Sequence, residues 1–178
     1  MRPLQIATPS DVPRLQRLVE RSVRALSEGY YTARQVESAL RYVFGPDTRL
    51  IADGTYYVIE GDAGELAAAG GWSHRRTLYG GDQAKGADDS LLDPAVDPAR
   101  IRAFFVHPSW ARRGLARCLF EQCRAAAVAA GFRTLELMAT LPGVPLYRAL
   151  GFTAAEPTVT ELPDGEVLPM VRMSRPLP

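Results

Sequence analysis

The chain has 178 residues, of which 47% are hydrophobic and 23% are charged. This length suits a single domain over residues 1–178, since domains typically hold roughly 100 to 200 residues, and the composition excludes disordered, collagen-like and coiled-coil proteins. The 21 basic and 20 acidic side chains give a formal net charge of +1. That balance removes the electrostatic argument for nucleic acid or an acidic membrane as a partner.

The first part of the chain predicts a strand, two helices and a strand hairpin. Residues 3–7 form the strand, and Thr8 caps a helix whose apolar stripe continues to Leu26. Thr32 and Gln35 form a capping box for a second helix, which ends at the Gly-Pro pair of residues 45–46. Residues 55–60 and 65–74 predict the hairpin.

Residues 75–100 show no periodicity and are rich in glycine, proline and aspartate. We expect a long loop there, and loops of this length are usually either functional lids or disordered inserts.

The second part of the chain alternates strands with helices. We expect a strand at residues 101–106, a helix at 113–130, a strand at 134–140 and a short helix at 142–150. Residues 158–162 and 167–173 flank a Pro-Asp-Gly turn as a final hairpin. No internal repeat is visible.

The cysteines, the histidines and the N-terminal residues give no sign of a metal site or a targeting segment. Cys118 and Cys123 match no metal or redox spacing, and the chain has only two histidines, so we expect no metal. The residues before Thr8 lack the apolar core of a signal peptide, and no run is long enough to span a membrane. The expected location is the cytoplasm. Asparagine is absent, and Lys85 is the only lysine.

The most informative stretch is residues 104–119, FFVHPSWARRGLARCL. It predicts a strand, a tight turn with Arg112, Arg113 and Gly114, and a helix that begins within the turn. Free N–H groups at a helix start, the helix dipole and two arginines form a local anion site, and glycine allows close approach of a phosphate. A basic, solvated helix start is the alternative interpretation. The fingerprints of P-loop, Rossmann and α/β-hydrolase proteins are absent.

Residues 106–116, VHPSWARRGLA, resemble the acetyl-CoA motif of the GNAT superfamily of N-acetyltransferases. Residues 146–152, LYRALGF, resemble the second conserved element of that superfamily. The resemblance extends over essentially the whole chain. It implies an α/β GNAT fold, with a mixed, largely antiparallel sheet flanked by about four helices, and acetyl-CoA as co-substrate.

The resemblance also implies roles for individual residues. The backbone of Phe104, Phe105 and Val106 would pair with the pantetheine amides. The pyrophosphate would lie on the N–H groups of Arg112, Arg113, Gly114, Leu115 and Ala116. Tyr147 would protonate the departing thiolate as general acid, because a phenol and a thiol differ little in pKa. A packing role for Tyr147 is the alternative.

Three residues depart from the family pattern. Ala111 stands where glutamine or arginine is usual, and the strand before the turn carries Arg100 and Arg102 where some relatives place a carboxylate base. The general base is therefore open among Glu28, His74, Glu136 and a water chain.

Glu136 is the sharpest candidate for the base, because strand alternation puts it on one face with Thr134 and Met138. An exposed or arginine-paired carboxylate is the alternative for Glu136. Candidates for an acceptor pocket are Glu28, Tyr30, Tyr31, Trp72 and His74, although aromatic residues at such places often belong to the core.

Together these features predict transfer of the acetyl group of acetyl-CoA to a primary amine by direct attack in a ternary complex. The acceptor would be a small-molecule or peptide amine, with neither nucleic acid nor membrane as a partner. An acyl-CoA-binding sensor or scaffold with little turnover is the alternative. Pairing of the final hairpin across a homodimer stays open.

Overall fold

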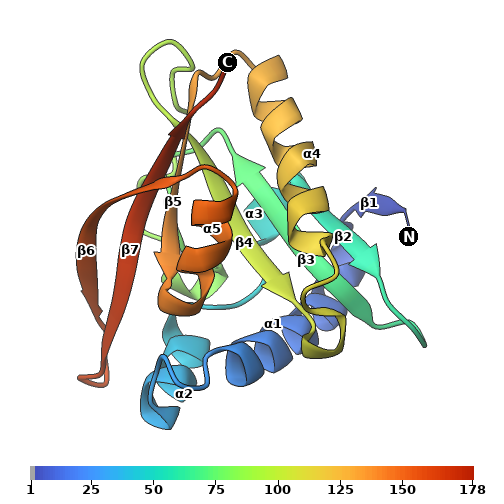
Figure 1. The fold of residues 1–178 in the computed structure, drawn as a ribbon, viewed down its shortest axis with the longest axis vertical. Coiled ribbons are helices and arrows are strands. Elements are labelled where there is room, and N and C mark those ends of the chain that lie inside the picture. Colours follow the sequence, from blue (N-terminus) through green and yellow to red (C-terminus); the bar gives the residue numbers. More distant parts are fainter. Residues whose placement is uncertain (1–2) are drawn as a thin grey trace.

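Seven strands form one sheet in the computed structural model, which describes residues 3–178 (Figure 1). They are β1 (Leu4–Ile6), β2 (Tyr56–Glu60), β3 (Leu66–Ser73), β4 (Ala99–Val106), β5 (Thr134–Thr140), β6 (Thr153–Glu161) and β7 (Val167–Pro176). The order is β1-β2-β3-β4-β5-β7-β6, and every neighbouring pair is antiparallel except β4 and β5, which are parallel. The expected mixed, largely antiparallel sheet is confirmed.

The described residues contain five α-helices rather than the expected four or so. They are α1 (Val12–Leu26), α2 (Ala33–Tyr42), α3 (Thr48–Ala52), α4 (Leu115–Ala129) and α5 (Val144–Ala149). The additional helix, α3, is a short one that Asp47 caps, because its carboxylate accepts hydrogen bonds from the N–H groups of Arg49 and Leu50. In this described part of the chain, no helix combines the length and apolarity that a membrane span requires.

Local sequence signals explain where the first helices begin. The Thr8 N–H donates to the Asp11 carboxylate over 2.8 Å at the start of the short 3-10 turn that leads into α1. Thr32 and Gln35 cap α2 reciprocally, as the sequence predicts, with distances of 3.1 and 2.9 Å. Each cap satisfies N–H groups that have no partner inside the helix.

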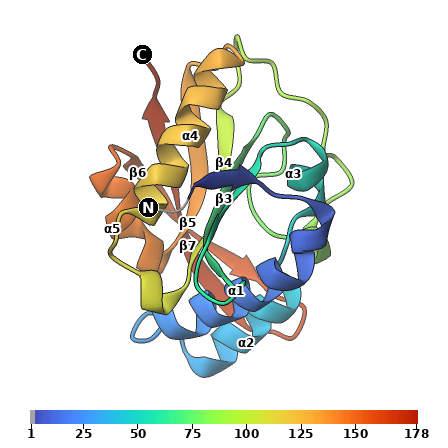
Figure 2. The same ribbon diagram turned by 90° about the vertical axis from the view of Figure 1, so that its right-hand side faces the viewer.

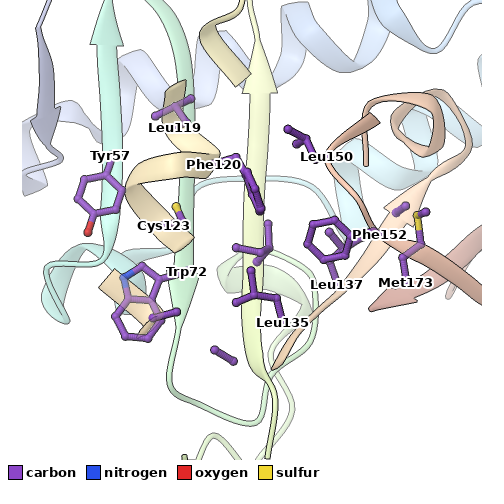
Figure 3. Close-up of a cluster of buried hydrophobic side chains, with 14 of the residues drawn as sticks. Tyr57, Trp72, Leu119, Phe120, Cys123, Leu135, Leu137, Leu150, Phe152 and Met173 are labelled. Atoms are coloured by element: carbon purple, nitrogen blue, oxygen red, sulfur yellow. The ribbon is translucent and has the colours of Figure 1, made fainter. Parts of the chain in front are cut away.

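Helices cover both faces of the sheet (Figures 1 and 2). Strand alternation divides β2 between the two layers: Tyr57 and Ile59 pack in the core under α4, while Tyr56 and Val58 pack with residues of α1 and α3. Figure 3 shows the first of these cores, with Leu119, Phe120 and Cys123 of α4 facing side chains of the sheet.

The segment between β3 and β4 is the predicted long loop, and it is anchored at several points. Arg75 and Leu91 form an isolated bridge, the Arg75 guanidinium binds Asp53, and the Thr77 hydroxyl donates to Asp89 over 2.6 Å. The segment has no periodic structure apart from a 3-10 turn at Asp82–Ala84, but it ends before residue 99 rather than at residue 100, because β4 begins at Ala99.

The last hairpin is longer than expected. β6 begins at Thr153 rather than residue 158, and it contains Pro157 beside an irregularity in its pairing with β7. A proline can occupy this place because β6 is an edge strand of the sheet, where its missing N–H removes no ladder hydrogen bond.

Candidate active site

A cavity of about 200 Å³ lies beside β4, where that strand separates from β5. Its walls come from the end of α1, the loop residues 78–81, β4 residues 101–106, the end of β5, and α5. Ala116, in the first turn of α4, also lines it. The cavity therefore connects the start of α4 with the loop on the other side of the sheet.

A β-bulge in β4 produces this opening. Arg102 pairs with Gly71 and Phe105 pairs with Ala69, so β4 has one more residue than β3 between the two pairs. The extra residue is Ala103, whose φ of 55° is in the left-handed region. Register with β5 is limited to Ala99 and Arg100. Beyond that point, the edge of β4 that faces β5 has no strand partner.

The bulge also decides which β4 side chains face which layer. Ile101, Phe104 and Val106 all pack with the core under α4, although 101 and 104 differ by an odd number of positions. Phe105 packs on the opposite layer, against Phe44. The three residues predicted to pair with pantetheine, Phe104, Phe105 and Val106, all line the cavity.

The turn before α4 leaves the start of that helix open. Gly114, the residue before α4, has a φ of 81°, and a Cβ placed there would meet no atom within 4 Å. No side chain caps α4, and Arg112 and Gly114 are exposed. The Arg113 guanidinium lies 5.0 Å from the centre of the Trp110 ring. Uncapped N–H groups, the positive end of the helix dipole and open space around a glycine fit a phosphate.

Tyr147 lies on α5 and lines the cavity. Its ring makes edge contacts with Phe104 and Phe152, with centroid distances of 6.4 and 5.8 Å. Burial raises the pKa of Tyr147 above its ordinary value, with a further contribution from the nearby Cys123. The phenol therefore keeps its proton at neutral pH and is available as a donor.

A family model for the acetyltransferase (GNAT) domain matches residues 52–154, which is more than half of the chain. The chain belongs to the GNAT family. Membership supports an N-acetyltransferase type of activity. A search among curated proteins finds no significant sequence match.

Several solved structures share the fold of this GNAT protein. A GCN5-related N-acetyltransferase from Rhodopseudomonas palustris matches with a TM-score of 0.72 and 18% identity, over 99% of this chain and 96% of the other. A phosphinothricin acetyltransferase from Sinorhizobium meliloti in complex with AcCoA matches with a TM-score of 0.62 and 20% identity, over 98% and 88%. PaiA N-acetyltransferase from Thermoplasma acidophilum, in complex with coenzyme A, matches with a TM-score of 0.65 and 12% identity, over 98% of each chain.

Glu136, the candidate base, does not reach the cavity of this GNAT domain. Its carboxylate is buried and ion-paired with Arg100 on one side and Arg172 on the other. The residue that lines the cavity is Met138, two positions further along the same face of β5. Both Glu136 carboxylate oxygens are engaged by arginines, which agrees with the arginine-paired alternative for this residue.

The residues predicted for an acceptor pocket lie outside the cavity lining. Trp72 is buried in the core beside Phe132 (Figure 3), and His74 lies 3.6 Å from Asp53. Glu28 and Tyr30 are exposed at the end of α1. The cavity lining gives no support to these four predictions: α1 contributes its last turn, and the lining at that end stops at Ser27.

Tyr31 also lies outside the cavity lining, and its hydroxyl makes two structural hydrogen bonds. It donates to the Pro169 carbonyl over 2.6 Å and accepts from the Leu141 N–H over 2.9 Å. Burial raises the pKa of Tyr31, which keeps this donor protonated. The hydroxyl joins α2's entry segment to β7 and to the turn before α5.

A buried charge cluster that the sequence did not indicate holds the cavity wall. The Arg102 guanidinium donates to the Asp47 carboxylate over 2.8 Å and to the carbonyls of Thr77 and Gly80 over 3.0 and 2.6 Å. Lys85 also binds Asp47. Burial lowers the pKa of Arg102, while Asp47 opposes that shift. The cluster fixes residues 78–81 against the cavity, and its partners lie too far apart in sequence for a local pattern to reveal it.

Within residues 3–178, no group of three or more His, Cys, Asp or Glu side chains is arranged to hold a metal ion.

Proposed function

We propose that this protein transfers the acetyl group of acetyl-CoA to a primary amine by direct attack in a ternary complex. The observation that carries the proposal is the single cavity that runs from Ala116 at the start of α4, along the unpaired edge of β4, to Tyr147. A GNAT acetyltransferase needs these three parts together: a phosphate site, a backbone edge for pantetheine and a proton donor for the thiol.

The chain's own groups supply binding and proton transfer. Backbone N–H groups of residues 112–116 would hold the pyrophosphate, and the edge of β4 at residues 104–106 would hold the pantetheine amides. Acetyl-CoA supplies a thioester carbonyl as the electrophile. Tyr147 would hold a proton at its hydroxyl for the departing sulfur, since a phenol is protonated at neutral pH and burial raises the pKa of Tyr147 further.

Direct attack is favoured over an acyl-enzyme because the cavity offers no activated nucleophile. Neither Cys118 nor Cys123 lines it, and burial raises the pKa of the Cys123 thiol, so the reactive thiolate is suppressed. Ser22, which does line the cavity, accepts a hydrogen bond from the Val106 N–H over 3.2 Å.

The test of the cofactor site is a charge substitution with a matched control. Gly114→Glu places a carboxylate where the pyrophosphate would bind, and we expect calorimetric titration with acetyl-CoA to show no binding. Gly165→Glu is the control, because Gly165 has a similar φ of 87° and equally open surroundings but lies in the β6–β7 turn. Unchanged binding to Gly114→Glu would overturn the assignment.

The second candidate is an acyl-CoA-binding sensor or scaffold with little turnover. One observation favours it: none of the described residues that line the cavity is a carboxylate or an imidazole. Release of free CoA across a panel of amines separates the two candidates, since a sensor binds acetyl-CoA tightly and yet turns over no amine.

A further inference from the structure

The cavity lining has an unusual chemistry for a site that accepts amines. Among the described residues that form it, no side chain is an aspartate, glutamate, histidine or lysine. The one charged side chain is that of Arg102, and its charge is balanced by the buried Asp47 at 2.8 Å. The cavity as a whole therefore offers no negative charge to an incoming cation.

Apolar side chains dominate the end of the cavity near α1 and the loop. Leu26, Phe44, Leu78, Phe105 and Met138 contribute to the lining there. Hydroxyl groups, such as that of Thr140, provide the remaining polar contacts. An ammonium group that entered this space would lose its hydration without gaining a counter-ion, which costs several kcal/mol.

Two buried carboxylates, Asp47 beside the lining residue Arg102 and Glu136 on the same strand as the lining residue Met138, do not change this conclusion, because each already forms ion pairs. Asp47 binds Arg102 and Lys85, and Glu136 binds Arg100 and Arg172. Moving either carboxylate toward a substrate amine would leave a buried arginine without its partner, at a cost comparable to the one being avoided.

We infer that the acceptor is a small, apolar primary amine of the arylalkylamine type, which enters the cavity as the neutral free base. This inference rests on the proposed acetyl transfer. The amine releases its ammonium proton to bulk water before it binds, so no side chain serves as a base for that step. The cavity of about 200 Å³ also has to hold the acetyl-bearing end of the cofactor, so the space left suits a compact acceptor rather than a long polyamine or an aminoglycoside.

The reaction balances without an enzymic carboxylate. The amine nitrogen forms a bond to the acetyl carbon, and the bond from that carbon to sulfur breaks. Nitrogen gives up one N–H proton to water, and sulfur receives a proton from Tyr147, which regains one from solvent. The only co-reactants are the amine and acetyl-CoA.

The first experiment compares two primary amines. 2-Phenylethylamine carries an apolar ring, whereas 1,4-diaminobutane carries a second ammonium group in its place. We expect kcat/KM to be about 100-fold higher for 2-phenylethylamine, equivalent to the loss of about 2.7 kcal/mol for the unpaired cation. Equal rates, or a preference for the diamine, would overturn the inference.

The second experiment follows pH. For benzylamine and the less basic 4-nitrobenzylamine, we expect kcat/KM to rise with pH and to level off at the solution pKa of each amine, so that the two profiles are displaced from one another. An inflection at one fixed pH for both amines would reveal a base on the protein and contradict the inference.

The third experiment moves a carboxylate into the cavity. Met138→Glu is compared with Met138→Gln, which has the same size and no charge. We expect only Met138→Glu to raise kcat/KM for 1,4-diaminobutane relative to 2-phenylethylamine, by about tenfold or more. The same change in both variants, or in neither, counts against the inference.

A binding readout keeps this inference distinguishable from the proposed function. Each amine is titrated by calorimetry into the wild-type protein saturated with CoA, at several pH values. Tighter binding of 2-phenylethylamine as pH rises, with no binding of the diamine, supports the inference even if turnover is absent. Absence of turnover in that case contradicts only the proposed activity, whereas tighter binding of the diamine contradicts the inference.

Discussion

From the sequence, Glu136 could be either a catalytic base or a carboxylate paired with arginine. Its side chain is 9% exposed and lies between Arg100, which is 12% exposed, and Arg172, which is half exposed. Burial lowers the pKa of Arg100, and the charge of Glu136 opposes that shift. The pair is therefore mutually dependent: removing the carboxylate leaves a largely buried guanidinium without a partner.

We expect Glu136→Gln to reduce the free energy of unfolding by about 3 kcal/mol, because it breaks a buried ion pair. Under conditions where the variant is folded, kcat is expected to stay near the wild-type value, since the residue lies outside the cavity. Urea denaturation and CoA release measure the two quantities. A large fall in kcat with unchanged stability would restore Glu136 as the base.

Tyr147 is the residue whose hydroxyl the proposed mechanism needs. In Tyr147→Phe we expect kcat to fall by about 100-fold, since a general acid typically contributes at least this factor, and acetyl-CoA affinity to change little. Calorimetry and CoA release separate the two effects. Tyr42→Phe, on α2 outside the cavity, is the matched control. If both variants retain full turnover, the proton comes from elsewhere.

At the scale of elements, the loop between β3 and β4 is fixed by charge rather than by an apolar core of its own. Arg75, at its start, holds the Asp53 carboxylate through two hydrogen bonds of 2.7 and 3.0 Å. That hydrogen bonding holds the pKa of Asp53 below its ordinary value of 3.8, against the opposing effect of burial. Both side chains are mostly buried.

This ion pair predicts a pH-dependent stability. A carboxyl group with a lowered pKa in the folded state stabilises the fold above its ordinary pKa and loses that contribution as the pH falls through the lowered value. We therefore expect Asp53→Asn to reduce the free energy of unfolding by about 2 kcal/mol at pH 7, with a smaller difference from wild type below pH 3.8. Urea denaturation across this range measures the effect.

The control for the pH effect is Arg75→Gln, which removes the other partner. The double variant is expected to cost little more than either single one, because both remove the same interaction. A cost of Asp53→Asn that is unchanged at acidic pH would show that the pair does not carry the linkage.

Elements with strong local signals could be predicted from the sequence, and those held by distant partners could not. The capping box of Thr32 and Gln35 marks the start of α2 because both partners lie within four residues. The strand at Thr134–Thr140 was predicted with the same limits that the structure gives. The short α3 was missed because five residues show no helical periodicity, although Asp47 is a capping residue that could have indicated it.

The same distinction between local signals and distant partners applies to the candidate site. The strand, turn and helix start that carry Phe104–Val106 and Gly114 could be predicted because they are continuous in sequence. The acceptor end could not, since it is assembled from α1, the loop, β4 and β5 through contacts such as Arg102 with Asp47, 55 positions apart. Along β5, periodicity identifies which residues share a face of the strand, but it does not tell how far along the strand the cavity lies. Glu136 and Met138 share one face, and only Met138 lines the cavity.

For the whole molecule, the decisive feature is that the sheet has two parts with little pairing between them. β1 to β4 form one part and β5 to β7 the other, and the register between them is confined to two residue pairs at the start of β4 and β5 (Figure 1). A ligand that lies along the open edge of β4 and reaches α4 and α5 would contact elements that belong to both parts.

We therefore expect acetyl-CoA to act as a structural bridge as well as a substrate. At a free concentration of about 100 times Kd, binding is expected to raise the free energy of unfolding by about 2.7 kcal/mol. Hydrogen exchange is expected to slow most at the first turn of α4, where N–H groups gain partners, and along β4 after Ala103, which the ligand would cover, and least in β1, which lies at the far edge of the sheet. Gly114→Glu should abolish the whole pattern. If protection at β1 equals that at the start of α4, the ligand stabilises the fold only globally, and the bridging role is contradicted.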